Sequence, residues 1–249
     1  MVTVKQDETI CSVGEFVSRL HDTSTGRRRL FRGQNTDQPL LPRIIRLAKE
    51  KGITPAEIND REERMLARFR RESVPMLPAL PVTRELGDWE LLSIAQHRGM
   101  PTRLLDWTAN PLAGLWFAVS ADPPNDERHG VVWALEGPNE QTFDSDRNVF
   151  TLPKTCFFQP PHLDRRIIAQ SGWFSVYRHN RTRFLPLENM ERYRNKLKRF
   201  IVPSASFHSL RQELRLLGIN HASMFPDLSG LGAEIQAEII DSWRGLSTI

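Results

Sequence analysis

The sequence predicts an α+β domain in which helices flank a mixed, mostly antiparallel sheet. Segments with helical and with strand periodicity are both present, but they do not alternate regularly, which argues against a doubly wound parallel sheet. A hydrophobic fraction of 39% and a charged fraction of 26% are typical of a globular protein and exclude a disordered chain. No internal repeat is visible, so we expect residues 1–249 to form a single domain.

Hydrophobic spacing and turn residues predict the elements of the first half. They are a helix over 9–20, a turn over 22–26, a strand over 29–33, a connection over 39–45, a charged helix over 55–71 and a helix over 89–97. We expect Asp88 to cap the last of these helices, and Gly99 followed by Pro101 to end it.

The second half is predicted in the same way. Its elements are a strand over 102–105, a helix over 110–120, a strand over 130–135, one or two strands over 166–177 and a helix over 207–217. Asn110 followed by Pro111 is a typical helix start, and Gly218 ends the last helix. The polar, proline-rich stretch 136–163 is expected to be a loop that either faces a ligand or partner or is an ordinary surface excursion.

The positive charge of the chain is modest but clustered. The net charge is +4, and arginines gather at 27–29, 64–71, 178–183 and 192–199. Arginine suits bidentate contact with phosphate, which points to a phosphate or nucleic-acid ligand. The alternative is a solvated surface of paired charges, since Glu62, Glu63 and Glu72 interleave with the second cluster.

Several classes of protein are disfavoured. No apolar run approaches a membrane span of roughly 18 residues, and the polar N-terminus has no signal-peptide core, so we expect a cytoplasmic protein without membrane contact. Cys11 and Cys156 are too far apart to indicate a zinc site or a disulfide framework. The histidines lack metal-ligand spacing, so no metal is expected.

Two motifs carry the chemical signal. In the first, Phe31–Gln34, an arginine at the end of a strand is followed by a glycine, which lets a ligand's phosphates approach its guanidinium. The alternative for Arg32 is a structural pair with a carboxylate such as Asp106. The second motif, Gln96–Leu112, places a carboxylate, an indole and a hydroxyl at the start of a helix, where free N–H groups favour anions. The alternative is that Asp106 and Thr108 only brace that helix.

These motifs resemble the FRG-domain family, which is named for its Phe-Arg-Gly element. The similar segments are Phe31–Gln34, Leu41–Arg43, Pro101–Thr108, Ala169–Phe174 and Ser223–Leu228. The resemblance spans roughly residues 13–231, and the length of the second motif makes it specific.

The order of the motifs is similar to that of mono-ADP-ribosyltransferases, which implies a fold of that type and NAD as substrate. Arg32-Gly33 matches the first signature element, Asp106–Thr108 the second and Ala169–Phe174 the third. The resemblance implies the following cofactor-binding residues: Arg32, Gly33, Gln34, Arg103, Trp107 and Thr108. It implies Asp106, Gln170 and His97 as catalytic residues, with a turn-stabilising hydrogen bond as the alternative for His97.

The third element departs from the transferase pattern, because Gln170 stands where the catalytic glutamate is expected. Either Asp106 supplies the missing charge or the chain binds nucleotide, ADP-ribose or RNA without chemistry. The enzyme hypothesis describes a bacterial toxin or anti-phage effector that modifies RNA or a protein and has an antitoxin as partner. A nuclease-like effector is a weaker hypothesis, because the acidic residues do not cluster as a metal site requires.

Overall fold

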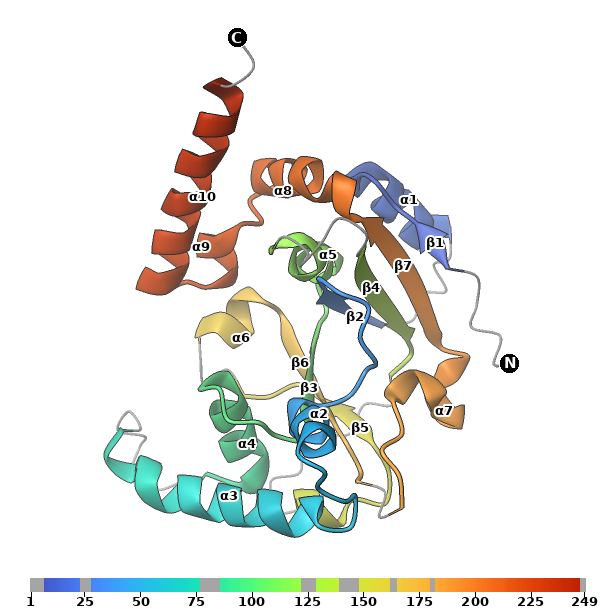
Figure 1. Ribbon diagram of the computed structural model, residues 1–249, viewed down its shortest axis with the longest axis vertical. Coiled ribbons are helices and arrows are strands. Elements are labelled where there is room, and N and C mark those ends of the chain that lie inside the picture. Colours follow the sequence, from blue (N-terminus) through green and yellow to red (C-terminus); the bar gives the residue numbers. More distant parts are fainter. Residues whose placement is uncertain are drawn as a thin grey trace.

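The computed structural model describes residues 7–22, 28–76, 86–121, 129–138, 148–161, 165–179 and 182–246. Within these residues seven strands form one sheet in the order β1-β7-β4-β2-β3-β6-β5 (Figure 1). The strands are β1 (Glu8–Thr9), β2 (Arg29–Gln34), β3 (Leu104–Thr108), β4 (His129–Glu136), β5 (Cys156–Phe158), β6 (Gly172–Val176) and β7 (Leu197–Pro203). Only the β1–β7 pair is parallel among these strands, so the predicted mixed, mostly antiparallel sheet is confirmed.

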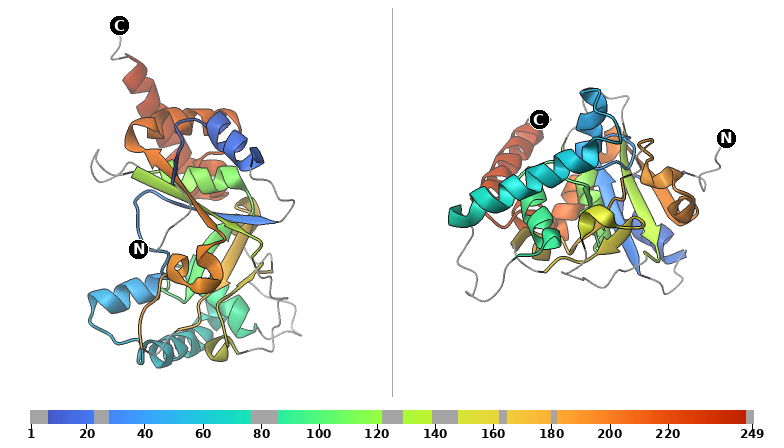
Figure 2. Two further views of the ribbon diagram at one scale, coloured as in Figure 1. Left: turned by 90° about the vertical axis from the view of Figure 1, so that its right-hand side faces the viewer. Right: turned by 90° about the horizontal axis from the view of Figure 1, so that it is seen from below.

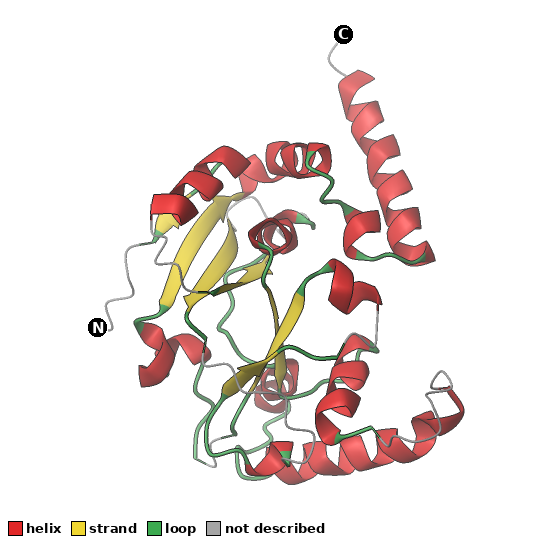
Figure 3. Ribbon diagram, turned by 180° about the vertical axis from the view of Figure 1, so that it is seen from behind, coloured by secondary structure: helices red, strands yellow, loops and turns green. Residues whose placement is uncertain are grey.

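Helices cover both faces of this sheet (Figure 2). They are α1 (Val13–Asp22), α2 (Arg43–Glu50), α3 (Ile58–Ser73), α4 (Asp88–His97), α5 (Pro111–Val119), α6 (Arg165–Ala169), α7 (Glu191–Arg194), α8 (Phe207–Leu216), α9 (His221–Met224) and α10 (Leu228–Leu246). One apolar cluster joins α1, α5 and α8 to the sheet, a second joins α2, and a third joins α3 and α4 to β3, β5 and β6. Seen from behind, α10 projects from the body (Figure 3).

The helix predicted after Asn110 forms as expected. The Asn110 side chain accepts hydrogen bonds from the N–H groups of Leu112, at 2.9 Å, and Ala113, at 3.4 Å. Pro111 occupies the first turn, where its missing N–H is harmless. Because the cap already uses two N–H groups and proline contributes none, the predicted anion site at this helix start is not supported.

The strand predicted over 102–105 is displaced along the chain. The N–H of Arg103 donates to the Glu62 carboxylate at 2.6 Å instead of to a neighbouring strand. The strand therefore begins at Leu104 and continues to Thr108. Asp106, Trp107 and Thr108 consequently lie within β3. The prediction that they lie between a strand and a helix is therefore wrong.

Four other boundaries differ from the predictions. Residues 8–9 pair with β7, so the first helix starts only at Val13. The predicted connection over 39–45 ends in α2, whose buried Ile44, Ile45 and Ala48 make a face too short to be recognised. Gly87, not Asp88, is the N-cap of α4. Residues 166–177 form α6 and β6 rather than strands alone.

One prediction falls largely outside the described residues: of the turn over 22–26, only residue 22 is described. The predicted loop over 136–163 is described at 136–138 and 148–161, and there the prediction is wrong in part, because this stretch contains the buried strand β5. In the described part of the chain, none of the helices combines the length and the apolar character that crossing a membrane requires.

Candidate functional site

The site is a pocket that opens where β2 and β3 separate. The register between these strands contains one pair, Phe31 opposite Thr108. An antiparallel ladder would next place Gly33 opposite Asp106, but the strands diverge there. The guanidinium of Arg32 occupies the gap and donates to the backbone carbonyl of Asp106 at 2.8 Å. A side chain thus replaces a ladder hydrogen bond, and a space opens beside it.

The exposure of Asp106 follows from how two helices share one face of β3. Leu104 packs beneath α4 in the third apolar cluster, while the Thr108 methyl lies beside Gly114 of α5. Alternation along the strand puts Asp106 on the same face between them. Neither helix covers it, and 59% of its side chain is exposed. A carboxylate is therefore presented on an otherwise covered sheet.

The resulting space, here called the β2–β3 pocket, has a volume of about 410 Å³. That is within the usual range for small-molecule sites of roughly 300–1,000 Å³. It collects residues from β2, β3, α2, α4, α5 and α6 and from the turn after α9. The residues that line it and matter here are Arg32, Arg43, Arg46, Gln96, His97, Asp106, Phe117, Arg166, Gln170 and Phe225.

Positive charge dominates the lining. Four arginines face the pocket, and Asp106 is the one acid among the described lining residues. Arg166 is neutralised by Asp227, to which its Nε donates at 2.8 Å. Arg32 lies 3.6 Å from the Asp106 carboxylate, so that acid offsets one further cation. The positive charge that remains comes from the two arginines of α2, Arg43 and Arg46, and it would favour an anionic ligand.

Burial, together with a neighbouring cation, disfavours the charge of each of the two inner arginines. Burial lowers the pKa of Arg32, and the nearby Arg46 lowers it further, while Asp106 acts in the opposite direction. Burial also lowers the pKa of Arg46, with Arg43 contributing. The Nε of Arg32 is buried and makes no hydrogen bond within the described residues. An anion placed among these side chains would relieve the repulsion and could satisfy that donor.

The acidic group is held in place by neighbours. Gln96 donates its amide to Asp106 at 3.2 Å, and Thr102 donates to the amide oxygen of Gln96 at 2.6 Å. Gln96 belongs to the second sequence motif but was not predicted as a site residue. Its role could be found only from contacts, because the motif does not show which way its amide points.

Two aromatic rings of the pocket were also missed by the sequence analysis. Phe117 and Phe225 are half-buried, with ring centroids 6.3 Å apart and planes at 84°. Phe117 lies in the helix predicted over 110–120 and Phe225 in the family-like segment Ser223–Leu228, but neither was predicted to line a site. Trp107 also lines the pocket, but its side chain is 3% exposed and its indole N–H donates to Ser175, so its predicted contact with a ligand stays a prediction.

Some of the other predicted site residues line the pocket, whereas others hold the fold together. His97 and Gln170 line the pocket with Arg32 and Asp106, although far apart in sequence. The amide of Gln170 donates to the Met224 carbonyl at 3.0 Å, which ties α6 to α9. Thr108 also lines the pocket, but its hydroxyl donates to the Gln170 carbonyl and accepts from Asn110. The predicted bracing role of Thr108 is therefore observed.

Gly33 and Gln34 serve the packing of the sheet. A Cβ at Gly33 would lie 2.0 Å from the carbonyl oxygen of Gly114 and 2.5 Å from the nitrogen of Ala118. The glycine thus permits close contact with α5, and because it also lines the pocket, the expected close approach of a ligand stays a prediction. The Gln34 side chain is buried and accepts a hydrogen bond from Trp133 at 3.2 Å.

Arg103 is not part of the pocket, contrary to expectation. Its side chain is 1% exposed, pairs with Glu62 at 2.9 Å and donates to Asn59 at 2.8 Å. His179 approaches the same carboxylate at 2.9 Å. This buried cluster joins α3 to the residue that directly precedes β3. The sequence could not reveal it, because Glu62 appeared to be a surface acid of a charged helix.

The described residues contain no group of three or more histidine, cysteine or acidic side chains that could hold a metal ion. A comparison with curated proteins and a comparison with solved structures each returned no match. A comparison with protein families matched residues 27–127 to the FRG domain. This match contains Arg32, Gln96 and Asp106, and with them the centre of the pocket. Residues 27–127 of the chain are therefore similar to the FRG domain.

Proposed function

We propose that the β2–β3 pocket binds NAD and that the chain is an NAD-dependent ADP-ribosyltransferase. The observation that carries the proposal is the meeting of Arg32, Asp106 and Gln170 at one cavity. These residues come from the three segments whose order is similar to the transferase signature. They lie on β2, on β3 and just before β6, which are neighbours in the sheet.

The lining suits the parts of a dinucleotide. Arg32, Arg43 and Arg46 offer guanidinium groups to the pyrophosphate. Phe117 and Phe225 offer ring surfaces to adenine or nicotinamide. Asp106 is the one acid among the described residues that line the pocket, and its carboxylate would face a ribose.

The reaction would need few groups. The bond between the ribose anomeric carbon and nicotinamide breaks, and nicotinamide leaves as a neutral molecule with the bonding electron pair. The acceptor forms a bond to the same carbon and gives up a proton, for which His97 is the lining base. Asp106 would stabilise the positive charge that develops on the ribose. The acceptor, RNA or protein, and an antitoxin partner stay predictions from the resemblance.

A second candidate, a module that binds nucleotide or ADP-ribose without turnover, is favoured by one observation. The carboxylate of Asp106 is already engaged by Arg32 and Gln96, and the amide of Gln170 by Met224. Groups held in this way could recognise a ribose without stabilising a cation.

The test combines calorimetry with product analysis. Wild type should bind NAD and release nicotinamide when an acceptor is present. Arg32→Lys keeps the charge but loses the planar fork, so NAD affinity should fall by about 1–3 kcal/mol. The control is Arg71→Lys on α3, whose side chain is 72% exposed and outside the pocket. Saturable binding without nicotinamide release would select the module, and unchanged NAD affinity in folded Arg32→Lys would reject the phosphate-binding role.

A further inference from the structure

A second and larger cavity, of about 680 Å³, lies apart from the β2–β3 pocket. The two spaces lie on opposite sides of neighbouring residues. Ile45 lines the larger cavity and Arg46 the pocket, and in the same way Arg103 lines the larger cavity and Leu104 the pocket. The larger cavity is lined by residues of α2 and of the start of α3, by the segment 150–155, by residues 177–179, which follow β6, and by residues of the segment before α7 and of α7 itself.

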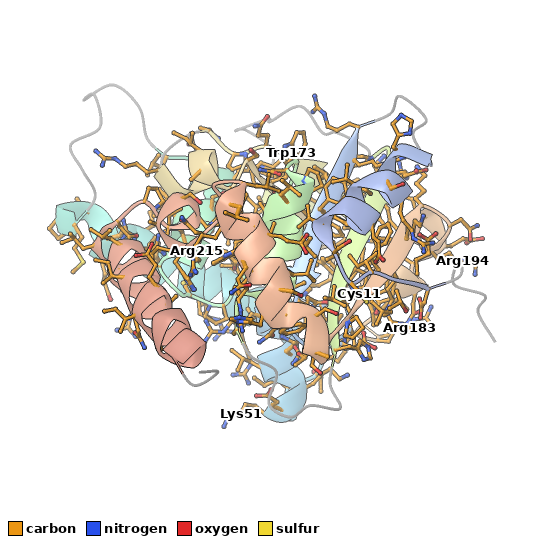
Figure 4. All side chains as sticks on the ribbon, turned by 90° about the horizontal axis from the view of Figure 1, so that it is seen from above. Cys11, Lys51, Trp173, Arg183, Arg194 and Arg215 are labelled. Carbon is orange, nitrogen blue, oxygen red and sulfur yellow. The ribbon has the colours of Figure 1, made fainter. Side chains whose placement is uncertain are left out.

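Its rim carries four exposed cations. They are Lys154, Arg178, Arg183 and Arg192, and the described residues that line the cavity include no aspartate or glutamate. The fifth cation, Arg103, lies inside and is neutralised by Glu62. Arg192 belongs to α7, and Figure 4 labels Arg183 and Arg194, the last residue of α7, on the same side of the molecule. We call this space the basic cavity.

The basic cavity also contains a buried polar atom without a partner. The His179 side chain is 3% exposed, and its Nε2 lies 2.9 Å from Glu62. Its Nδ1 is buried and has no hydrogen-bond partner among the described residues. A buried ring nitrogen that is left unsatisfied costs free energy, and a ligand that enters the cavity could satisfy it.

Aromatic surface lies beside the charge. Phe150 and Phe184 are half-buried and line the same cavity. Arginines that contact phosphates, together with rings on which bases stack, are the combination that binds single-stranded nucleic acids. The volume is sufficient for a nucleotide.

We propose that the basic cavity binds a nucleotide through its phosphate and base, either as part of single-stranded RNA or as a free mononucleotide. Arg178, Arg183 and Arg192 contact the phosphates, and Phe150 or Phe184 contacts the base. This site is independent of the proposed NAD pocket.

The test measures fluorescence anisotropy with a labelled single-stranded oligouridylate and, separately, displacement by AMP. The variant is the double substitution Arg178→Gln and Arg183→Gln, which alters exposed side chains. We expect its affinity for the bound probe to fall at least tenfold. For RNA, the dependence of log affinity on log salt should weaken by about 1.4, roughly 0.7 for each lost phosphate contact.

The matched control is Arg68→Gln with Arg71→Gln, which removes the same charge from exposed positions of α3. Arg71 lies twelve residues beyond Asn59, the α3 residue that lines the cavity, and thus about 18 Å along the helix. The control should bind as wild type does. AMP that displaces the oligonucleotide identifies a single nucleotide as sufficient, whereas RNA binding without AMP binding identifies the polymer.

The proposal is overturned if wild type binds neither probe, or if the double variant binds as tightly as the control. NAD affinity should be the same in all three proteins, because the β2–β3 pocket is untouched. Loss of NAD binding by Arg32→Lys alone would therefore test the proposed function without affecting this result.

Discussion

At the scale of single residues, burial decides which charged groups hold the fold and which are offered to a ligand. Glu62 is 0% exposed and is enclosed by Arg103 and His179. Asp106, on the contrary, is 59% exposed and touches its cation at 3.6 Å. The first group is costly to remove, because its partners would remain buried without it. The second contributes little to stability.

The buried group predicts how stability depends on pH. Burial lowers the pKa of His179, while Glu62 opposes that effect. Burial alone would raise the pKa of Glu62, but Arg103 and His179 outweigh it and hold that pKa below its ordinary value. In both cases the unfolded chain takes up its proton first as pH falls. Stability is therefore greatest above the ordinary histidine pKa of 6.5 and declines below it, first through His179 and then through Glu62.

We expect the melting temperature of wild type to fall between about pH 7.5 and about pH 5.5. In His179→Gln this fall should be smaller, since glutamine does not titrate. The control His21→Gln changes an exposed histidine of α1 and should keep the wild-type fall. An identical pH dependence in His179→Gln would show that this group does not govern stability.

At the scale of elements, the contact between β2 and α5 positions the pocket. Gly33 and Gly114 allow the helix to lie directly on the strand, and Phe31 of β2 lies beside Gly114 in the same apolar cluster. Asp106 lies in the interval between α5 and α4, and 59% of its side chain is exposed. The close approach therefore contributes to the shape of the β2–β3 pocket, which Gly33 also lines.

Gly33→Ala should lower the free energy of unfolding by about 1–3 kcal/mol, the usual cost of overpacking. The new methyl would meet backbone atoms of α5, which cannot turn aside as a side chain could. Gly14→Ala in α1 is the control, since its nearest neighbour would lie 3.9 Å away, and it should be neutral or stabilising by about 0.5–1 kcal/mol. Urea denaturation gives both values. A Gly33→Ala variant as stable as wild type would contradict the described packing.

Elements with strong local signals were predictable, and those defined by partners were not. The helix α5 was predicted because Asn110 and Pro111 mark its start in the sequence. The strand β1 was missed because two residues carry no periodicity and form a strand only by pairing with β7. The shift of β3 arose in the same way, since the Glu62 carboxylate takes the N–H of Arg103.

At the scale of the whole molecule, the sequence indicated which segments would meet but not which side chains would face the pocket. Arg32, His97, Asp106 and Gln170 come together as expected. Arg103 and Trp107 belong to the same motif but point into the interior. Alternation along a strand predicts two faces without showing which one is covered, and that depends on helices distant in sequence.

The global fold also makes Asp106 suitable for a decisive substitution. Its main link to Arg32 uses the backbone carbonyl, which Asp106→Asn retains. An asparagine can still accept the hydrogen bond from Gln96. Since the side chain is largely exposed, we expect the melting temperature to change little.

The measurement that tests the central claim most directly is nicotinamide release from NAD by wild type, Asp106→Asn and the surface control Glu63→Gln, each with its melting temperature. If Asp106 stabilises the cationic ribose, Asp106→Asn should retain NAD binding and lose turnover by about 10²-fold or more, roughly 2.7 kcal/mol or more of barrier. Glu63→Gln alters an exposed acid of α3 and should match wild type. A stable Asp106→Asn protein with full turnover would contradict the account.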